Sequence, residues 1–161
     1  MKFKLITMFA AALLLTACSS SEEAATTDTS GSSTDGSGTA MAAPGSIEDF
    51  QINVGDRVFF DYDSYEVRAD AQDTLQKQAA WLQQYPTYTI TVEGHCDERG
   101  TREYNLALGE RRANSVKNYL VALGIDANRV QTVSYGKERP EIEGSDETAW
   151  AQNRRGVTVL Q

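Results

Sequence analysis

One stretch of sequence decides the fold: Thr89-Ile90-Thr91-Val92-Glu93-Gly94-His95-Cys96-Asp97-Glu98-Arg99-Gly100, followed by a helical pattern from about Glu103. Its first residues are β-branched and alternate, which indicates a strand, and residues 94–100 read as a polar loop. A strand that runs through a loop into a helix puts polar side chains at the sheet's carboxyl edge, beside free helix N–H groups. The loop supplies the carboxylate of Asp97 and the helix supplies the guanidinium of Arg112. This pair suits a ligand that carries both charges.

The flanking sequence predicts an α/β domain over residues 47–161. Strands are expected at residues 57–62, 87–94, 130–135 and 156–160, and helices between Val67 and Pro86 and over residues 103–123. Gly124 is a typical residue to end the second helix, and Asp146 is expected to cap a short turn. The order β-α-β-α-β-β predicts a two-layer sandwich with both helices on one face of the sheet.

Apolar residues at helical spacing predict the core faces of the two helices. In the first helix they are Val67, Ala71, Leu75, Ala79 and Leu82, and in the second Leu106, Ala113, Val116, Leu120 and Leu123. Trp81 and Trp150 are interpreted as core or rim packing and not as stacking platforms.

The N-terminal region reads as a lipoprotein leader. Lys2 and Lys4 precede an apolar run over residues 5–17 that is too short to span a bilayer. The run ends in Leu15-Thr16-Ala17-Cys18, which resembles the bacterial lipobox, so residues 1–17 are expected to be removed and Cys18 to be acylated. Ser19, where an Asp would signal inner-membrane retention, favours the outer membrane. Residues 18–46 then form a disordered tether rich in Ser, Thr, Gly and Ala, about 30 Å in root-mean-square span.

The charge balance excludes one large class of partners. The formal net charge is −8, and without Lys2 and Lys4 the chain has 13 basic and 23 acidic residues, a net charge of −10. Nucleic-acid binding depends on neutralising phosphates with Lys and Arg. A nucleic-acid partner is therefore not expected.

Several motifs together resemble the OmpA-like peptidoglycan-binding domain. They are residues 91–101, Glu103-Tyr104-Asn105, residues 108–113, Val133-Ser134-Tyr135-Gly136, Asn153-Arg154-Arg155 and, with the lipobox, Phe60-Asp61-Tyr62-Asp63. The resemblance implies a mixed sheet of order 1-4-2-3 and no enzymatic activity. It also implies an outer-membrane tether that binds murein without covalent attachment, and a periplasmic Tol β-propeller partner that competes for an overlapping surface.

By position, the resemblance assigns Asp97 and Arg112 to the meso-diaminopimelate of the wall's stem peptide. Asn105 and Arg154 match further positions at that site, and we expect Leu108 and Asp61 to belong to it as well. The residues suit this ligand chemically. The far end of diaminopimelate carries an ammonium and a carboxylate on one carbon, and the planar fork of an arginine can bind the carboxylate bidentately.

The placement of these residues is open from the sequence. Asn105, Leu108 and Arg112 fall at i, i+3 and i+7, a stripe about 100° from the predicted core face. The alternative is a surface loop and a solvated charge cluster around Arg112. Spacing does not decide between the two, and only the resemblance brings Asp97 and Arg112 together.

An enzyme and a purely protein-binding lipoprotein are the other function classes. The run His95-Cys96-Asp97 invites a thiol or metal hypothesis, but neighbours on a strand point to opposite faces, which suits a nucleophile–base pair badly. His95 is the sole histidine, and a zinc site needs three or four ligands. We expect no metal, no cofactor and no catalysis, with Cys96 semi-buried and His95 a hydrogen-bonding loop residue.

Overall fold

The structure, a computed structural model, describes residues 42–161. The predicted signal peptide, the acylated Cys18 and the tether up to residue 41 lie outside the described residues and stay predictions. Among residues 42–161, no helix is both long enough and apolar enough to cross a bilayer.

The described chain follows the predicted order, with three short helical segments added to it and a short helix, α4 (Glu147–Asn153), where a short turn was predicted. The elements are α1 (Ile47–Asp49), a π-helical turn η1 (Phe50–Val54), β1 (Arg57–Phe59), α2 (Ala69–Gln84), β2 (Ile90–His95), α3 (Arg102–Ala122), a 3-10 turn η2 (Ala127–Arg129), β3 (Val130–Gly136), α4 (Glu147–Asn153) and β4 (Arg155–Leu160). Two predicted signals at helix boundaries are confirmed. Gly124 follows α3 with a φ of 97°, and the Asp146 side chain caps α4 by accepting a hydrogen bond from the Ala149 N–H.

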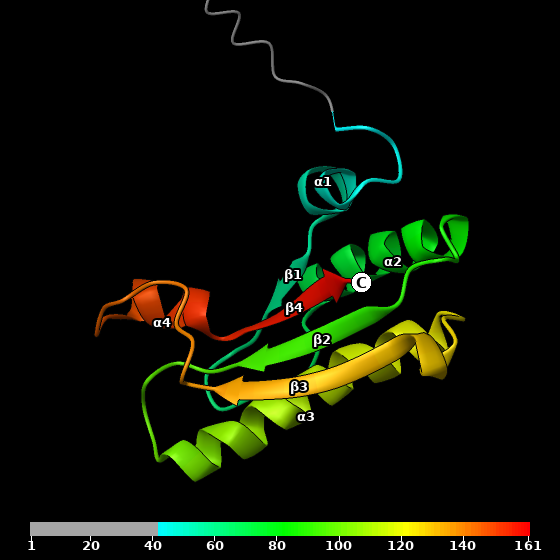
Figure 1. Ribbon diagram of the computed structural model, residues 1–161. Coiled ribbons are helices and arrows are strands. Elements are labelled where there is room, and N and C mark those ends of the chain that lie inside the picture. The colour runs from blue at the N-terminus through cyan, green and yellow to red at the C-terminus, as the bar shows by residue number, and fades with distance from the viewer. Residues whose placement is uncertain (1–41) are drawn as a thin grey trace, which may run out of the picture. The chain divides into compact units, whose positions relative to one another are not determined.

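The four strands form one mixed sheet in the order β1-β4-β2-β3, as the family resemblance implied. β4 runs antiparallel to both β1 and β2, and β2 runs parallel to β3. Figure 1 shows α2 and α3 on the same face of this sheet, and α4 beside the carboxyl ends of β2 and β3. The two-layer α/β sandwich is therefore confirmed.

The core lies between the sheet and the two long helices. The predicted positions Ala71, Leu75, Ala79 and Leu82 of α2 are buried, and so are Ala113, Val116 and Leu120 of α3, while Val67 and Leu123 pack against the core half-buried. Leu106 is 40% exposed, so its assignment to the core is wrong. It lies in a shallow groove with Thr132, Val133 and Ser134 of the edge strand β3.

The buried face of α3 also corrects the predicted stripe. Asn105, Leu108 and Arg112 are buried together with the core residues Ala113 and Val116. The stripe is therefore continuous with the core face and not set apart from it. The predicted core face was placed too far from the stripe because it included Leu106. In the sequence, an apolar residue that packs beside an edge strand cannot be told from a core residue.

β1 is shorter than predicted, because the chain turns away from the sheet after Phe60. The Phe60 N–H still donates to the Arg154 carbonyl, but Asp63 then adopts a φ of 54°. The carbonyls of Asp61 and Ser64 accept hydrogen bonds from the Arg112 guanidinium at 3.0 and 2.8 Å. A side chain from α3 thus holds residues 61–64 as a loop, of which the sequence pattern had placed residues 61 and 62 in the strand.

The backbones of β2 and α3 cross in direct contact at two glycines. A Cβ atom built on Gly94 would lie 1.8 Å from the Gly109 carbonyl oxygen, and one built on Gly109 would lie 2.3 Å from the Ser134 Oγ. No side chain fits between the strand and the helix there. This crossing fixes the end of β2 against the first half of α3, which is where the candidate site residues lie.

Candidate ligand-binding site

A hollow of about 200 Å³ lies where β2 ends and α3 begins. Its lining residues are Tyr62, Asp63, Cys96, Asp97, Arg99, Gly100, Tyr104, Asn105, Leu108 and Arg112. Pockets for drug-sized ligands measure about 300–1,000 Å³, so this hollow suits a smaller group, such as the end of one amino-acid side chain.

Arg112 is a buried cation without a counter-ion. Its side chain is 1% exposed, and its three nitrogens donate to the carbonyls of Ser64, His95 and Asp61 at 2.8–3.0 Å. Within the part of the chain that the structure describes, no carboxylate forms an ion pair with it. Burial lowers the pKa of the Arg112 guanidinium, but arginine keeps its charge in proteins.

An anion that enters the hollow would gain from this arrangement. A guanidinium has five N–H groups, and the three hydrogen bonds to carbonyls leave part of that capacity free. A buried charge without a partner is costly. A ligand carboxylate would therefore both fill the free hydrogen-bonding capacity and compensate the charge.

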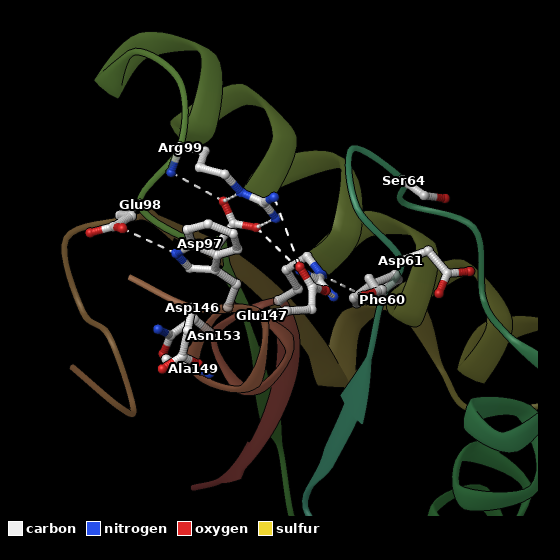
Figure 2. Close-up of polar contacts among 12 residues, drawn as sticks. Phe60, Asp61, Ser64, Asp97, Glu98, Arg99, Asp146, Glu147, Ala149 and Asn153 are labelled. Carbon is white, nitrogen blue, oxygen red and sulfur yellow. Dashed lines mark hydrogen bonds and ion pairs between the residues drawn. The ribbon is translucent and has the colours of Figure 1, made fainter. Parts of the chain in front are cut away.

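Asp97, unlike Arg112, has more than one counter-ion, because it pairs with two arginines. The Arg99 guanidinium donates to both of its oxygens, at 3.2 and 2.6 Å, and Arg154 donates to Oδ2 at 3.4 Å. Burial opposes the charged form of Asp97, but the hydrogen bonds and charge of Arg99, aided by Arg154, outweigh burial and hold the pKa of Asp97 below its ordinary value. Figure 2 shows the Arg99 guanidinium facing the Asp97 carboxylate.

Arg99 lies between two aromatic rings at the mouth of the hollow. Its guanidinium carbon is 4.1 Å from the centre of the Tyr62 ring and 4.0 Å from that of Trp150. The Trp150 Nε1–H donates to Glu98, which holds the ring in place. Trp150 was not expected to be a stacking platform, and this is wrong in one respect, because the Arg99 side chain of the same protein stacks on its ring. Trp81, by contrast, is a core residue as expected.

Four of the six predicted ligand residues line one hollow: Asp97, Asn105, Leu108 and Arg112. Of these, Asn105 turns its amide to the chain and donates to the carbonyls of Arg99 and Thr101. It therefore shapes the loop that carries Asp97.

The other two predicted residues lie outside the lining. The Asp61 carboxylate pairs with Arg68 and is 70% exposed, and only its carbonyl reaches Arg112. Arg154 lies behind Asp97, where it also donates to the Phe60 carbonyl and pairs with Glu147. Arg154 is thus placed to orient Asp97.

The aromatic and charged rim of the hollow was not predicted from the sequence. Tyr62 and Tyr104 are 62% and 45% exposed, and the Tyr104 hydroxyl donates to Asp63. A tyrosine outside any apolar periodicity was the available signal, because exposed aromatic residues are often binding residues. The role of Arg99 had no such signal, since its two rings come from segments far apart in the sequence.

His95 and Cys96 are not arranged for chemistry. Burial and the nearby charge of Arg155 lower the pKa of His95, and burial raises the pKa of the Cys96 thiol to about 11. The thiol donates to the Asn105 carbonyl, and both side chains are buried, more than expected. In residues 42–161, no three His, Cys, Asp or Glu side chains gather closely enough to hold a metal ion.

Comparison with known proteins gives one consistent family. The OmpA family model matches residues 59–154. The peptidoglycan-associated lipoprotein of Brucella melitensis is 61% identical over 125 residues, which cover 78% of this chain and 74% of that protein. The protein of that name from Rhizobium meliloti is also 61% identical over 125 residues, covering 78% and 71%.

Solved structures agree with the sequence comparison. The crystal structure of the peptidoglycan-associated lipoprotein from Burkholderia pseudomallei superimposes with a TM-score of 0.64 at 47% identity, covering 66% of this chain and 90% of that one. The C-terminal domain of Helicobacter pylori MotB gives a TM-score of 0.62 at 22% identity, covering 66% and 84%. At that identity, the likeness to MotB extends to the fold alone.

Proposed function

The chain belongs to the OmpA family, and on that premise we propose that it binds peptidoglycan without covalent attachment and tethers the outer membrane to the cell wall. Its relatives are lipoproteins named for their association with peptidoglycan. The family places it among binding proteins and not among enzymes. The observation on which the proposal rests is the buried Arg112, which pairs with no carboxylate in the described part of the chain and shares the lining of the hollow with Asp97.

The ligand group is the free end of meso-diaminopimelate in the stem peptide. Its carboxylate pairs with Arg112, which offers a planar donor fork in a buried setting. Its ammonium pairs with Asp97, the acid that two arginines hold in the charged form in spite of its burial. The hollow of about 200 Å³ suits this end and leaves the rest of the peptide and the glycan outside.

Cys18 carries the lipid anchor and residues 19–41 belong to the tether, with the domain facing the periplasm from the outer membrane. Gly45 and Ser46, at the end of the predicted tether, are held on the domain instead, because the Tyr88 hydroxyl donates to the Gly45 carbonyl and Ser46 caps α1. A periplasmic Tol β-propeller protein is the partner in envelope integrity and cell division. The exposed rings of Tyr62 and Tyr104, which line the hollow, support such an overlapping surface, because aromatic residues are enriched at protein interfaces. Murein and this partner would then compete.

Murein binding is tested directly by sedimentation. The full chain, purified in a mild detergent, should sediment with protein-free murein sacculi and should be released by boiling in detergent, because no covalent bond forms. Excess soluble meso-diaminopimelate stem peptide should reduce the sedimented fraction. A chain that stays in the supernatant at every sacculus concentration would contradict the proposal and would favour a purely protein-binding lipoprotein.

Anchoring makes a separate prediction. Cys18→Ser should abolish palmitate incorporation and leave the protein out of outer-membrane fractions, because no acyl chain can be added. The wild-type chain in the same cells is the control. A Cys18→Ser protein that still incorporates palmitate and fractionates with the outer membrane would show the lipobox interpretation to be wrong.

A further inference from the structure

Hydrogen bonds from Arg99 and Arg154 already occupy the Asp97 carboxylate, which we assign to the ligand's ammonium. Asp97 Oδ1 accepts from the Arg99 backbone N–H at 3.1 Å and from its Nε at 3.2 Å. Oδ2 accepts from the Arg99 Nη2 at 2.6 Å and from the Arg154 Nη1 at 3.4 Å. A carboxylate offers about four acceptor positions, so an ammonium has no free position unless one of these donors leaves.

Arg99 is the donor that can leave, and Arg154 is not. The Arg154 side chain is 8% exposed, lies outside the lining of the hollow, and is held by the Phe60 carbonyl and by Glu147. The Arg99 side chain is 29% exposed and lines the hollow. Apart from Asp97, it is held by the two rings of Tyr62 and Trp150 and by a longer pair with Glu147, at 3.9 Å.

We propose that the Arg99 side chain is an internal competitor for the ligand's ammonium: it pairs with Asp97 in the free protein, and its guanidinium is displaced when the ligand binds. This inference rests on the proposed function and concerns the regulation of the same site. In the free protein, Arg99 neutralises the charge of Asp97. A ligand with an ammonium must break the Arg99–Asp97 pair, and its affinity is lower because of that free-energy cost. A ligand with only a carboxylate pairs with Arg112 and leaves Arg99 in place.

The test combines one substitution with two ligands. Isothermal titration of the full chain in detergent compares a meso-diaminopimelate stem peptide with a matched peptide that lacks only the distal ammonium. Arg99→Gln removes the charge and the fork but keeps a shorter polar side chain. It should bind the diaminopimelate peptide about three- to fivefold more tightly than wild type, the upper part of the range for an exposed ion pair. Its affinity for the ammonium-free peptide should change by less than about twofold.

A matched arginine provides the control. Arg102 is the first residue of α3 and makes an exposed pair with Glu138, so Arg102→Gln removes the same charge near the site without freeing Asp97. It should bind both peptides as wild type does. Trp150 adds a second readout, because the guanidinium stacks on its ring: its emission should change when wild type binds the diaminopimelate peptide, and not when it binds the ammonium-free peptide.

The outcomes separate this inference from the proposed function. If Arg99→Gln binds the diaminopimelate peptide no more tightly than wild type, and wild type binds it well, the proposal that Arg99 competes with the ligand is refuted. The proposed function is unaffected by that result. Equal tightening for both peptides would also refute the competition by Arg99, because the effect would not depend on the ammonium. Binding by neither wild type nor variant would overturn the proposed function and this inference with it.

Discussion

Asp97→Asn should weaken binding of a meso-diaminopimelate stem peptide by well over tenfold, because it keeps the shape of the side chain and removes the charge that faces the ligand's ammonium. Removing one partner of a desolvated charge pair costs about 2–5 kcal/mol, and about 1.4 kcal/mol corresponds to tenfold in affinity. Isothermal titration measures the change. Asp73→Asn, on the exposed surface of α2, is the matched control and should bind as wild type does.

Arg112 should show an effect of the same size for a second reason. Arg112→Lys keeps a charge but loses the fork that can meet a carboxylate bidentately. It also loses donors to the carbonyls of Asp61, Ser64 and His95, so the loop over residues 61–64 is expected to loosen. Binding should fall by well over tenfold, and the midpoint of urea unfolding, measured alongside, should fall as well.

The ligand tests the same charge pair without changing the fold. A stem peptide with Lys in place of diaminopimelate lacks the distal carboxylate, and amidation of that carboxylate removes its charge. Both peptides should bind wild type far more weakly than the diaminopimelate peptide. Equal affinity for the Lys and diaminopimelate peptides would refute the paired-charge mechanism even if the chain still sedimented with sacculi.

The second large effect is structural. Gly94→Ala should destabilise the domain by about 3 kcal/mol or more, because the new methyl group would lie 1.8 Å from the Gly109 carbonyl oxygen. Ordinary overpacking costs about 1–3 kcal/mol, and here the obstacle is backbone, which cannot move aside as a side chain can. Urea unfolding followed by circular dichroism measures the change in the free energy of unfolding. Ligand binding should weaken as well, since the crossing sets where Asp97 lies relative to α3.

Gly156 offers the matched control for Gly94. The two glycines pair across β2 and β4, but a Cβ built on Gly156 would meet the side chains of Val116 and Phe60 at 3.3 and 3.4 Å. These side chains can adjust by a few tenths of an ångström. Gly156→Ala should therefore cost clearly less than Gly94→Ala, and equal costs for the two would show that backbone contact at Gly94 is not the cause.

The sequence by itself determined the fold class and much of the core. Alternating β-branched residues in residues 89–92 and helical spacing in Ala71, Leu75, Ala79 and Leu82 are local signals, and each indicates one element and its buried face. The family motifs then supplied the sheet order, which spacing does not contain. Asp97 and Arg112 could be named for the same reason, although nothing local brings them together.

The tertiary structure alone decided what surrounds each charge. Arg112 is buried and has no counter-ion among residues 42–161, because carbonyls from residues 61–64 and from β2 converge on it. The acceptor positions of the Asp97 carboxylate are occupied because Arg99 folds back over it between the rings of Tyr62 and Trp150. These two rings come from opposite ends of the domain sequence. Burial, pairing and competition among charges depend on distances between segments far apart in the chain. Residue periodicity reports which face of its own element a residue occupies, and it carries no information about those distances.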